Sequence, residues 1–163
     1  MMHIKPNSLL LRQIAPSMVL LTALLFGGVA QAQGGPQPRL PTVDLRAGMH
    51  TIKAELAVTP EQQMTCMMFR TEMNGNEGML FVADEKSGRC FWMKNTLVPL
   101  TIAFIDDDGT IVNLADMKPR DESSHCAKAP VRYALEMHQG WFDKRGIKAG
   151  FKLGGRPFGG APR

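Results

Sequence analysis

The residues best suited to chemistry in this sequence lie between Cys90 and Ile111, where a polar triplet separates two apolar runs. The triplet is Lys94-Asn95-Thr96, and Trp92 lies just before it. A lysine ammonium donates hydrogen bonds to negative or carbonyl oxygens, Asn and Thr add neutral hydrogen-bonding groups, and an indole ring forms an apolar wall. This combination predicts a binding site for a small ligand that carries an anionic or carbonyl oxygen.

Four polar side chains further along the chain extend this candidate site: Arg120, His125, Arg132 and Glu136. Alternation along a strand places Arg132 and Glu136 on one face. It likewise places Trp92 and Lys94 on one face of an earlier strand. If the two strands pair or face each other, Lys94 meets Glu136 in an ion pair that satisfies buried charges and fixes the register, which is the structural alternative to a ligand site.

Signals of catalysis are weak in this sequence. Ser123 and Ser124 lie close to His125, but neighbours along the chain rarely form a triad, and no G-x-S-x-G elbow occurs. Glu136 alone does not supply the paired carboxylates of a glycosidase. Catalytic residues therefore stay unassigned, and a hydrolase-like enzyme of the cell envelope is the alternative to a binding module.

A methionine-rich composition raises a further hypothesis, the handling of Cu(I). The chain has 12 methionines, and thioether, thiolate and imidazole ligands suit this ion. Possible ligands are Met64, Met67, Met137, His138, His50 and His125. Methionine at helical or strand spacing is more often core filler, so we predict neither a metal site nor a cofactor. Exposed methionine clusters would support copper, whereas burial beneath a sheet would exclude it.

The acidic run Asp106-Asp107-Asp108-Gly109 resembles the start of a calcium loop, but the later glutamate of that motif is missing. Asp108-Gly109 lies between two apolar strands, and glycine tolerates the positive φ of a tight turn. We therefore expect a β-hairpin.

The elements that must position these residues follow from hydrophobic periodicity. Residues 51–58 alternate as a half-buried strand, and Thr59, Pro60 and Gln62 predict a capped helix that ends near residue 75. Further strands are expected at Met79–Ala83, Arg89–Asn95, Leu100–Asp106, Thr110–Met117 and Val131–Met137. A last helical turn at Trp141–Arg145 would end at Gly146. The fold class is mainly β, a compact antiparallel sandwich or barrel of about six strands with one short capped helix after the first strand.

The N-terminus carries the pattern of a secretory signal peptide. Lys5 and Arg12 precede an apolar run that is too short for a membrane span, and Ala30-Gln31-Ala32 fits a cleavage site. We expect a signal peptide at 1–32, a flexible segment at 33–48, a single β domain at 49–154 and a flexible tail at 155–163. The protein would be periplasmic or secreted, with no membrane anchor after cleavage.

The charge balance narrows the class of partner. The chain has 19 Lys and Arg against 15 Asp and Glu, interleaved along its length. Such a pattern does not favour a nucleic-acid or anionic-membrane surface. We expect a monomer whose partner is a small molecule or another ligand of the cell envelope.

Three cysteines in an exported chain are best explained by one disulfide and one free thiol. Three pairings are possible, and two free thiols or a redox pair are the alternatives. Cys66 follows a helical methionine pattern and fits a small buried hydrophobe. Cys90 begins a strand and Cys126 lies in a polar loop, so their placement favours a Cys90–Cys126 disulfide. No C-x-x-C motif occurs, which argues against thioredoxin-like chemistry.

Three blocks of sequence carry a resemblance to a known family: GMLFVADE from Gly78, FWMKNTLVPLTIAFIDDDGTIV from Phe91 and YALEMHQGWFDKRGIKAG from Tyr133. Together they resemble domain-of-unknown-function family 192 over Ile52 to Leu153. The resemblance implies a small all-β domain, often behind a signal peptide, with no established activity. Two positions depart from the family pattern: Cys66 stands where glycine is usual, and Thr101 stands where aspartate is typical, which weakens a chemical role for an acid beside Pro99.

Overall fold

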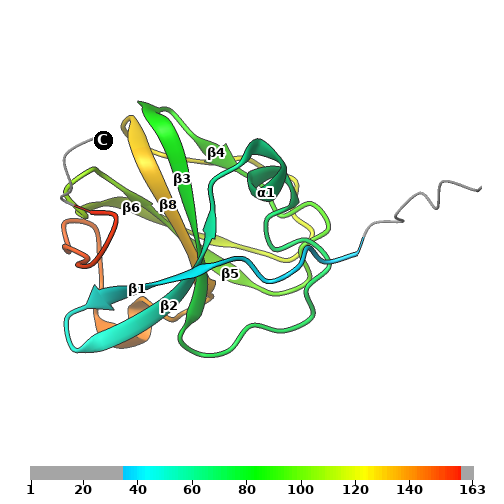
Figure 1. Cartoon of the computed structure of the whole chain (residues 1–163), viewed down its shortest axis with the longest axis horizontal. Helices are drawn as coiled ribbons and strands as arrows, with labels where there is room; N and C mark the ends of the chain where they lie inside the picture. The colour runs from blue at the N-terminus through cyan, green and yellow to red at the C-terminus, as the bar shows by residue number, and fades with distance from the viewer. Residues whose placement is uncertain (1–34, 159–163) are drawn as a thin grey trace, which may run out of the picture. The chain divides into compact units, whose positions relative to one another are not determined.

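The computed structural model describes residues 35–158, in which six strands form one sheet and two short strands form a separate ribbon (Figure 1). The sheet order is β1-β2-β3-β8-β5-β6, and the ribbon pairs β4 with β7. The elements are β1 Thr42–Ala47, β2 His50–Ala57, α1 Pro60–Thr65, β3 Glu77–Ser87, β4 Cys90–Phe91, β5 Leu100–Ile105, β6 Ile111–Met117, β7 His125–Cys126, β8 Val131–His138 and the 3₁₀ helix η1 Asp143–Arg145. The mainly β fold predicted from the sequence is confirmed, and it is sandwich-like rather than a closed barrel.

The connection between β2 and β3 differs from the antiparallel pattern that we predicted. These two strands are parallel, whereas the other pairs are antiparallel. A parallel pair requires a crossover connection, and residues 58–76, which include α1, supply it. No helix among residues 35–158 is long and apolar enough to cross a membrane.

Helix α1 begins as predicted and ends earlier. The Gln62 amide donates to the Thr59 hydroxyl and the Thr59 amide donates to the Gln62 side chain, which completes the capping box. The helix stops at Thr65 because Cys66 has φ 46° and leaves the helical region. Helix α1 follows the second strand rather than the first, because β1 lies within the segment 33–48 that was expected to be flexible.

The sheet has an apolar core on each face. The first core includes Leu45, Ile52, Leu80, Leu135, Tyr133 and Met137, and the C-terminal residues Trp141, Phe142, Ile147 and Leu153 pack against it. The second core includes Met79, Phe81, Ile102, Phe104 and Ala134, and it is covered by Met67, Met93 and Val98 from loops. In Figure 1 the C-terminal residues, drawn in orange and red, lie to the left of β3 and β8, while α1 and β4 lie to the right. Both faces are therefore covered largely by irregular chain.

The C-terminal segment 150–154 joins the two edge strands of the sheet. Gly154 forms a bridge with Arg46 on β1, and Lys152 forms one with Thr110 just before β6. The chain beyond Gly154 was expected to be a flexible tail, but Phe158 packs edge-to-face on Tyr133 at 5.2 Å between ring centroids. This segment shields two strand edges that would otherwise be open to pairing with other chains.

The predicted hairpin at Asp108-Gly109 is present between β5 and β6. Gly109 has φ +90°, and a Cβ at this position would lie 2.3 Å from the carbonyl oxygen of Leu153.

We expect Gly109→Ala to lower the free energy of unfolding by about 1 to 3 kcal/mol because it adds both backbone strain and a clash, as measured by chemical denaturation. Gly75→Ala is the matched control, since its added methyl group would meet nothing within 4 Å. Equal stability of the two variants would contradict this account of the turn.

Candidate functional site

The polar triplet lies in a turn rather than in a strand. The strand predicted at Arg89–Asn95 is wrong beyond Phe91, where β4 ends. The Met93 amide donates to the carbonyl of Asp121, and the Thr96 amide donates to the carbonyl of Met93. Asn95 has φ 56°, a left-handed conformation that is uncommon outside glycine but that Asn tolerates better than most residues. Alternation therefore does not apply to this segment.

Three residues with left-handed backbones are connected through this turn. Phe69, Asn95 and Arg120 have φ values of 61°, 56° and 61°. The Phe69 amide donates to the Asn95 carbonyl at 2.8 Å, and the Arg120 amide donates to the Thr96 carbonyl at 3.1 Å. Such conformations persist only where the surroundings impose them, and they cluster at binding and catalytic sites. We call the surface formed by Phe69, Trp92, Lys94, Asn95 and Arg120 the loop surface.

The side chains of the loop surface are largely accessible. Trp92 is 50% exposed, and the Lys94 ammonium lies 5.4 Å from the centroid of its ring. Asn95 and Arg120 are exposed. Among residues 35–158, no carboxylate forms an ion pair with Lys94 or Arg120. Thr96 is only 3% exposed, so it supports the turn from below.

The expected ion pair between Lys94 and Glu136 is not formed, and this prediction is wrong. Glu136 points from β8 into the second core, between Met79 on β3 and Ile102 on β5. It is 2% exposed, and its Oε2 has no hydrogen-bond partner within the described chain. Burial raises the pKa of Glu136 to about 8. The error arose because Lys94 was assigned to a strand, whereas the alternation expected for β8 is correct.

The two remaining predicted residues make their contacts elsewhere, Arg132 at the hairpin turn and His125 in the ribbon. Arg132 donates from Nε to Asp107 Oδ1 at 3.0 Å and from Nη1 to the Asp84 carbonyl, so the hairpin turn engages it. His125 pairs with Phe91 in the ribbon, and its Nε2 lies 3.5 Å from Ser123 Oγ. Among the predicted residues, the structure shows the Lys94 ammonium over the Trp92 ring and the Arg120 amide bonded to the Thr96 carbonyl.

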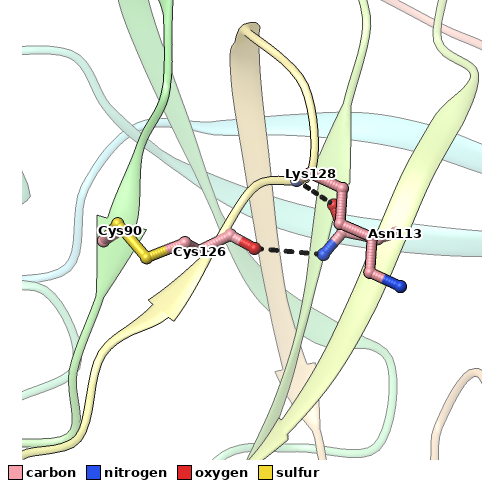
Figure 2. The surroundings of a disulfide bond; sticks show 4 residues. All are labelled: Cys90, Asn113, Cys126 and Lys128. Atoms are coloured by element: carbon pink, nitrogen blue, oxygen red, sulfur yellow. Dashed lines mark hydrogen bonds between the residues drawn. A yellow bond between two sulfur atoms is a disulfide. The ribbon is translucent and has the colours of Figure 1, made fainter.

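The disulfide Cys90–Cys126 is formed as predicted and joins the two strands of the ribbon (Figure 2). The amide side chain of Asn113 on β6 donates to the Cys126 carbonyl at 3.2 Å and accepts from the Lys128 amide at 2.9 Å. Cys66 is the free cysteine and is partly buried. Burial, together with the charge of Glu136, raises the pKa of the Cys66 thiol far above its ordinary value.

A buried ion pair beside the loop surface was missed by sequence reasoning. Arg70 donates from Nη1 and Nη2 to the two carboxylate oxygens of Glu55 at 2.5 and 2.8 Å, and Arg39 and the Leu40 amide also donate to this carboxylate. Burial raises the pKa of Glu55, but these hydrogen bonds lower it more, to about 2. The alternating pattern had placed Glu55 on an exposed face, because nothing local in the sequence shows that β2 is covered on both sides.

A groove of about 210 Å³ connects this ion pair with the loop surface. Its lining residues are Pro36, Gln37, Arg39, Phe69, Arg70, Thr71 and Glu72. Phe69 belongs to both features, and its amide is bonded to Asn95. Both guanidinium groups in its lining, those of Arg39 and Arg70, are bonded to Glu55.

A second groove of about 350 Å³ lies on the other side of β5 and contains the position where aspartate was expected. Thr101 Oγ1 donates to Asp116 Oδ1 at 2.6 Å, and Lys128, Asp143 and Lys148 also line this groove. Both Thr101 and Asn113, its buried polar residues, are satisfied by protein partners.

The copper hypothesis fails the burial criterion stated above. Met67, Met79, Met93, Met117 and Met137 are at most 1% exposed and fill the two cores. Met64 and Met49 are exposed but come from different elements. Within residues 35–158, no three His, Cys, Asp or Glu side chains converge as a metal site.

The chain is similar to one protein family and to two solved structures. Residues 43–155 match the family DUF192, described as "Uncharacterized ACR". A crystal structure from Sinorhizobium meliloti 1021, described as a "putative transcription regulator", is 34% identical with a TM-score of 0.70, covering 73% of this chain and 97% of that chain. A protein of unknown function from Novosphingobium aromaticivorans DSM 12444 is 36% identical with a TM-score of 0.65, covering 69% and 83%. No curated protein matches the sequence.

The buried ion pair generates a prediction about stability. Arg70→Met leaves the Glu55 carboxylate without its bidentate partner, so the free energy of unfolding should fall by about 3 to 5 kcal/mol in chemical denaturation at pH 7. Adding Glu55→Gln should recover part of this loss, because the buried charge is then removed. Arg39→Met is the control, since this side chain is 56% exposed and should contribute about 1 kcal/mol or less. Equal losses for Arg70→Met and Arg39→Met would contradict the assignment.

The unpaired carboxyl of Glu136 generates a prediction about pH. In the unfolded chain it titrates near 4.5, and in the folded chain near 8. Between these values the unfolded state releases a proton that the folded state keeps, so stability falls as pH rises through this window and levels off above it. Glu136→Gln should remove this decline, which is at most about 5 kcal/mol, when unfolding is measured from pH 4 to 9. Glu122→Gln, a change at an exposed carboxyl, should leave the decline intact. A decline that persists in Glu136→Gln would refute the assignment.

Proposed function

This chain belongs to the DUF192 family, and from that premise we propose that it is an exported accessory domain that binds a small ligand at the loop surface. The family description names no activity, so the proposal depends on the geometry of this chain. The observation that carries it is the set of three left-handed residues, Phe69, Asn95 and Arg120, connected by backbone hydrogen bonds through one turn. Strained residues held in this way keep a surface in one shape before the ligand arrives, which lowers the entropic cost of binding.

The exposed side chains define the chemistry of the ligand. Lys94 and Arg120 offer donors to a negative or carbonyl oxygen. The half-exposed ring of Trp92 offers a flat apolar face. The adjoining groove is lined by Arg39 and Gln37, whose side chains already donate to Glu55 and to the Cys66 carbonyl, and by Glu72. We infer a ligand that has one carboxylate or carbonyl group and one apolar or sugar-like face.

The disulfide supports the exported location in this proposal. Disulfides persist in oxidising compartments such as the periplasm or the extracellular space, and Cys90–Cys126 is one. The predicted signal peptide at 1–32 lies outside the described residues, so the export route rests on the sequence pattern alone. Intact mass measurement of the protein recovered from the periplasm or medium tests it, with an N-terminus at Gln33 as the expected result.

A binding screen tests the ligand assignment. Thermal-shift and calorimetric titrations would use glucuronic acid, N-acetylmuramic acid, glucose and citrate, because this panel separates the carboxylate from the sugar face. We expect an acidic sugar to bind. Lys94→Met should lower the affinity for this sugar about tenfold or more, because a charge-assisted hydrogen bond is lost. The same substitution should change stability by about 0.5 kcal/mol or less, as for an exposed side chain.

The matched control is Lys144→Met, which removes an exposed lysine from η1 on the first-core side of the sheet. It should leave both affinity and stability unchanged. Trp92→Ala should lower the affinity for an acidic sugar but change the affinity for citrate little, since citrate has no ring face. Binding that is equally strong in Lys94→Met and wild type would overturn the location of the site.

A further inference from the structure

The ribbon of β4 and β7 forms the base of two of the three loops in the loop surface. It contains two residue pairs, Cys90 with Cys126 and Phe91 with His125. The chain leaves β4 directly into Trp92 and Lys94, and it enters β7 from the loop that carries Arg120. An isolated ribbon of this length has little stability of its own, so the covalent bond adds to the contacts that hold the two loops together.

Each half of the ribbon has its own contact with the sheet: β4 packs on β3 and β5, and β7 is held by β6, the neighbour of β5. On β4, the Phe91 ring packs against Phe81 and Phe104 at centroid distances of 4.9 and 5.9 Å. On the other side, Asn113 of β6 holds the chain at Cys126 and Lys128 (Figure 2). The Met93 amide to the Asp121 carbonyl and the Arg120 amide to the Thr96 carbonyl are two backbone hydrogen bonds that connect the Lys94 turn to the Arg120 loop.

The disulfide is also accessible. Both Cys90 and Cys126 are exposed, whereas the sheet strands β5 and β8 are almost wholly buried. The 36-residue separation of the two cysteines encloses the β5–β6 hairpin, whose pairing with β8 does not involve the ribbon. An exposed disulfide is open to a dithiol reductant, and neither cysteine belongs to a strand of the six-stranded sheet.

We propose that the Cys90–Cys126 disulfide is a redox-cleavable clasp on the loop surface, so that its reduction separates the Arg120 loop from the Lys94 turn while the six-stranded sheet stays folded. This regulation rests on the proposed function for its effect on ligand binding. The oxidised form is the binding form, and the reduced form loses affinity because the Arg120 amide is no longer held at the Thr96 carbonyl of the Lys94 turn.

The reaction is a two-electron thiol–disulfide exchange. A thiolate of a dithiol attacks one sulfur of the disulfide, the S–S bond breaks, and a mixed disulfide forms with release of the other cysteine as a thiolate. The second thiol of the reductant then attacks the mixed disulfide. The dithiol ends as a disulfide, and Cys90 and Cys126 end as two thiols after taking up the two protons that the dithiol loses.

Amide hydrogen exchange tests the clasp without any ligand. We would compare the oxidised protein, the protein reduced with dithiothreitol, and the Cys90→Ala/Cys126→Ala double variant. The amides of Met93 and Arg120 bridge the two loops, and their exchange should become about tenfold faster or more when the clasp opens. The amide of Thr96 bonds within its own turn and should change much less, and the amides of β3 and β8 should stay protected.

The controls make the outcomes distinct. Cys66→Ala keeps the disulfide, so it should match wild type when oxidised and respond in the same way when reduced. Unchanged protection of Met93 and Arg120 after reduction would overturn the clasp. Loss of sheet protection together with the loop amides, or a double variant that does not fold, would also overturn it, because the disulfide would then hold the whole domain.

The link to binding is tested separately with glucuronic acid and N-acetylmuramic acid. Affinity in the oxidised form that falls about tenfold or more on reduction supports the switch. Equal affinity in both redox forms overturns the switch but leaves the proposed function standing. Opening of the loops on reduction with no binding of any probe in either form overturns the ligand assignment but leaves the clasp standing as a conformational device.

Discussion

The parallel pairing of β2 with β3 is the constraint on which the rest of the structure depends. Parallel neighbours cannot be joined by a tight turn, so the chain between them must cross one face of the sheet. That crossover places Met67 over the second core and brings Arg70 to the Glu55 carboxylate. The pair in turn fixes Phe69, the residue before Arg70, whose amide binds the Lys94 turn. A requirement of sheet topology therefore determines where the loop surface lies.

Loops that cover a sheet face bury backbone polar groups, which need hydrogen-bond partners. Loop backbones carry donors and acceptors that must be satisfied when they are buried, and here the loops satisfy one another. The carbonyls of Asn95 and Thr96 accept from two other loops, and this arrangement requires left-handed backbones at non-glycine residues. The same bonds that complete the cover make its outer surface rigid. The shape of the loop surface is thus a consequence of how the second core is covered, and the proposed binding would use a shape that folding already imposes.

Local signals in the sequence predicted local structure well. The capping box at Thr59, the hairpin glycine Gly109 and the alternation along β8 each depend on residues a few positions apart. The disulfide also followed from the placement of Cys90 and Cys126. Several of the failures are long-range. Strand β1 is a short edge strand whose alternation is flanked by proline and glycine, so its order comes from pairing with β2 and from the bridge to Gly154.

The geometry around the candidate residues was not predicted. Lys94 and Asn95 lie in a turn that long-range hydrogen bonds connect to two other loops, and no pattern in the sequence displays these bonds. Glu55 was misjudged for a related reason. An alternating pattern tells which residues share a face and gives no information on what covers that face.

The two buried glutamates show that the chain covering the sheet determines whether a buried carboxyl group is ionised. Glu55 and Glu136 lie in the same cross-sheet row, each beside Met79. The crossing chain offers Glu55 a guanidinium, which holds its pKa at about 2, whereas burial alone raises the pKa of Glu136 to about 8. An ionised carboxylate without a partner would be far too costly in an apolar layer, so Glu136 is accommodated as the neutral acid. The guanidinium of Arg70 reaches Glu55 on β2 but forms no bond with Glu136 on β8. The same layer therefore holds an ionised Glu55 and a protonated Glu136, and the path of the crossover determines this difference.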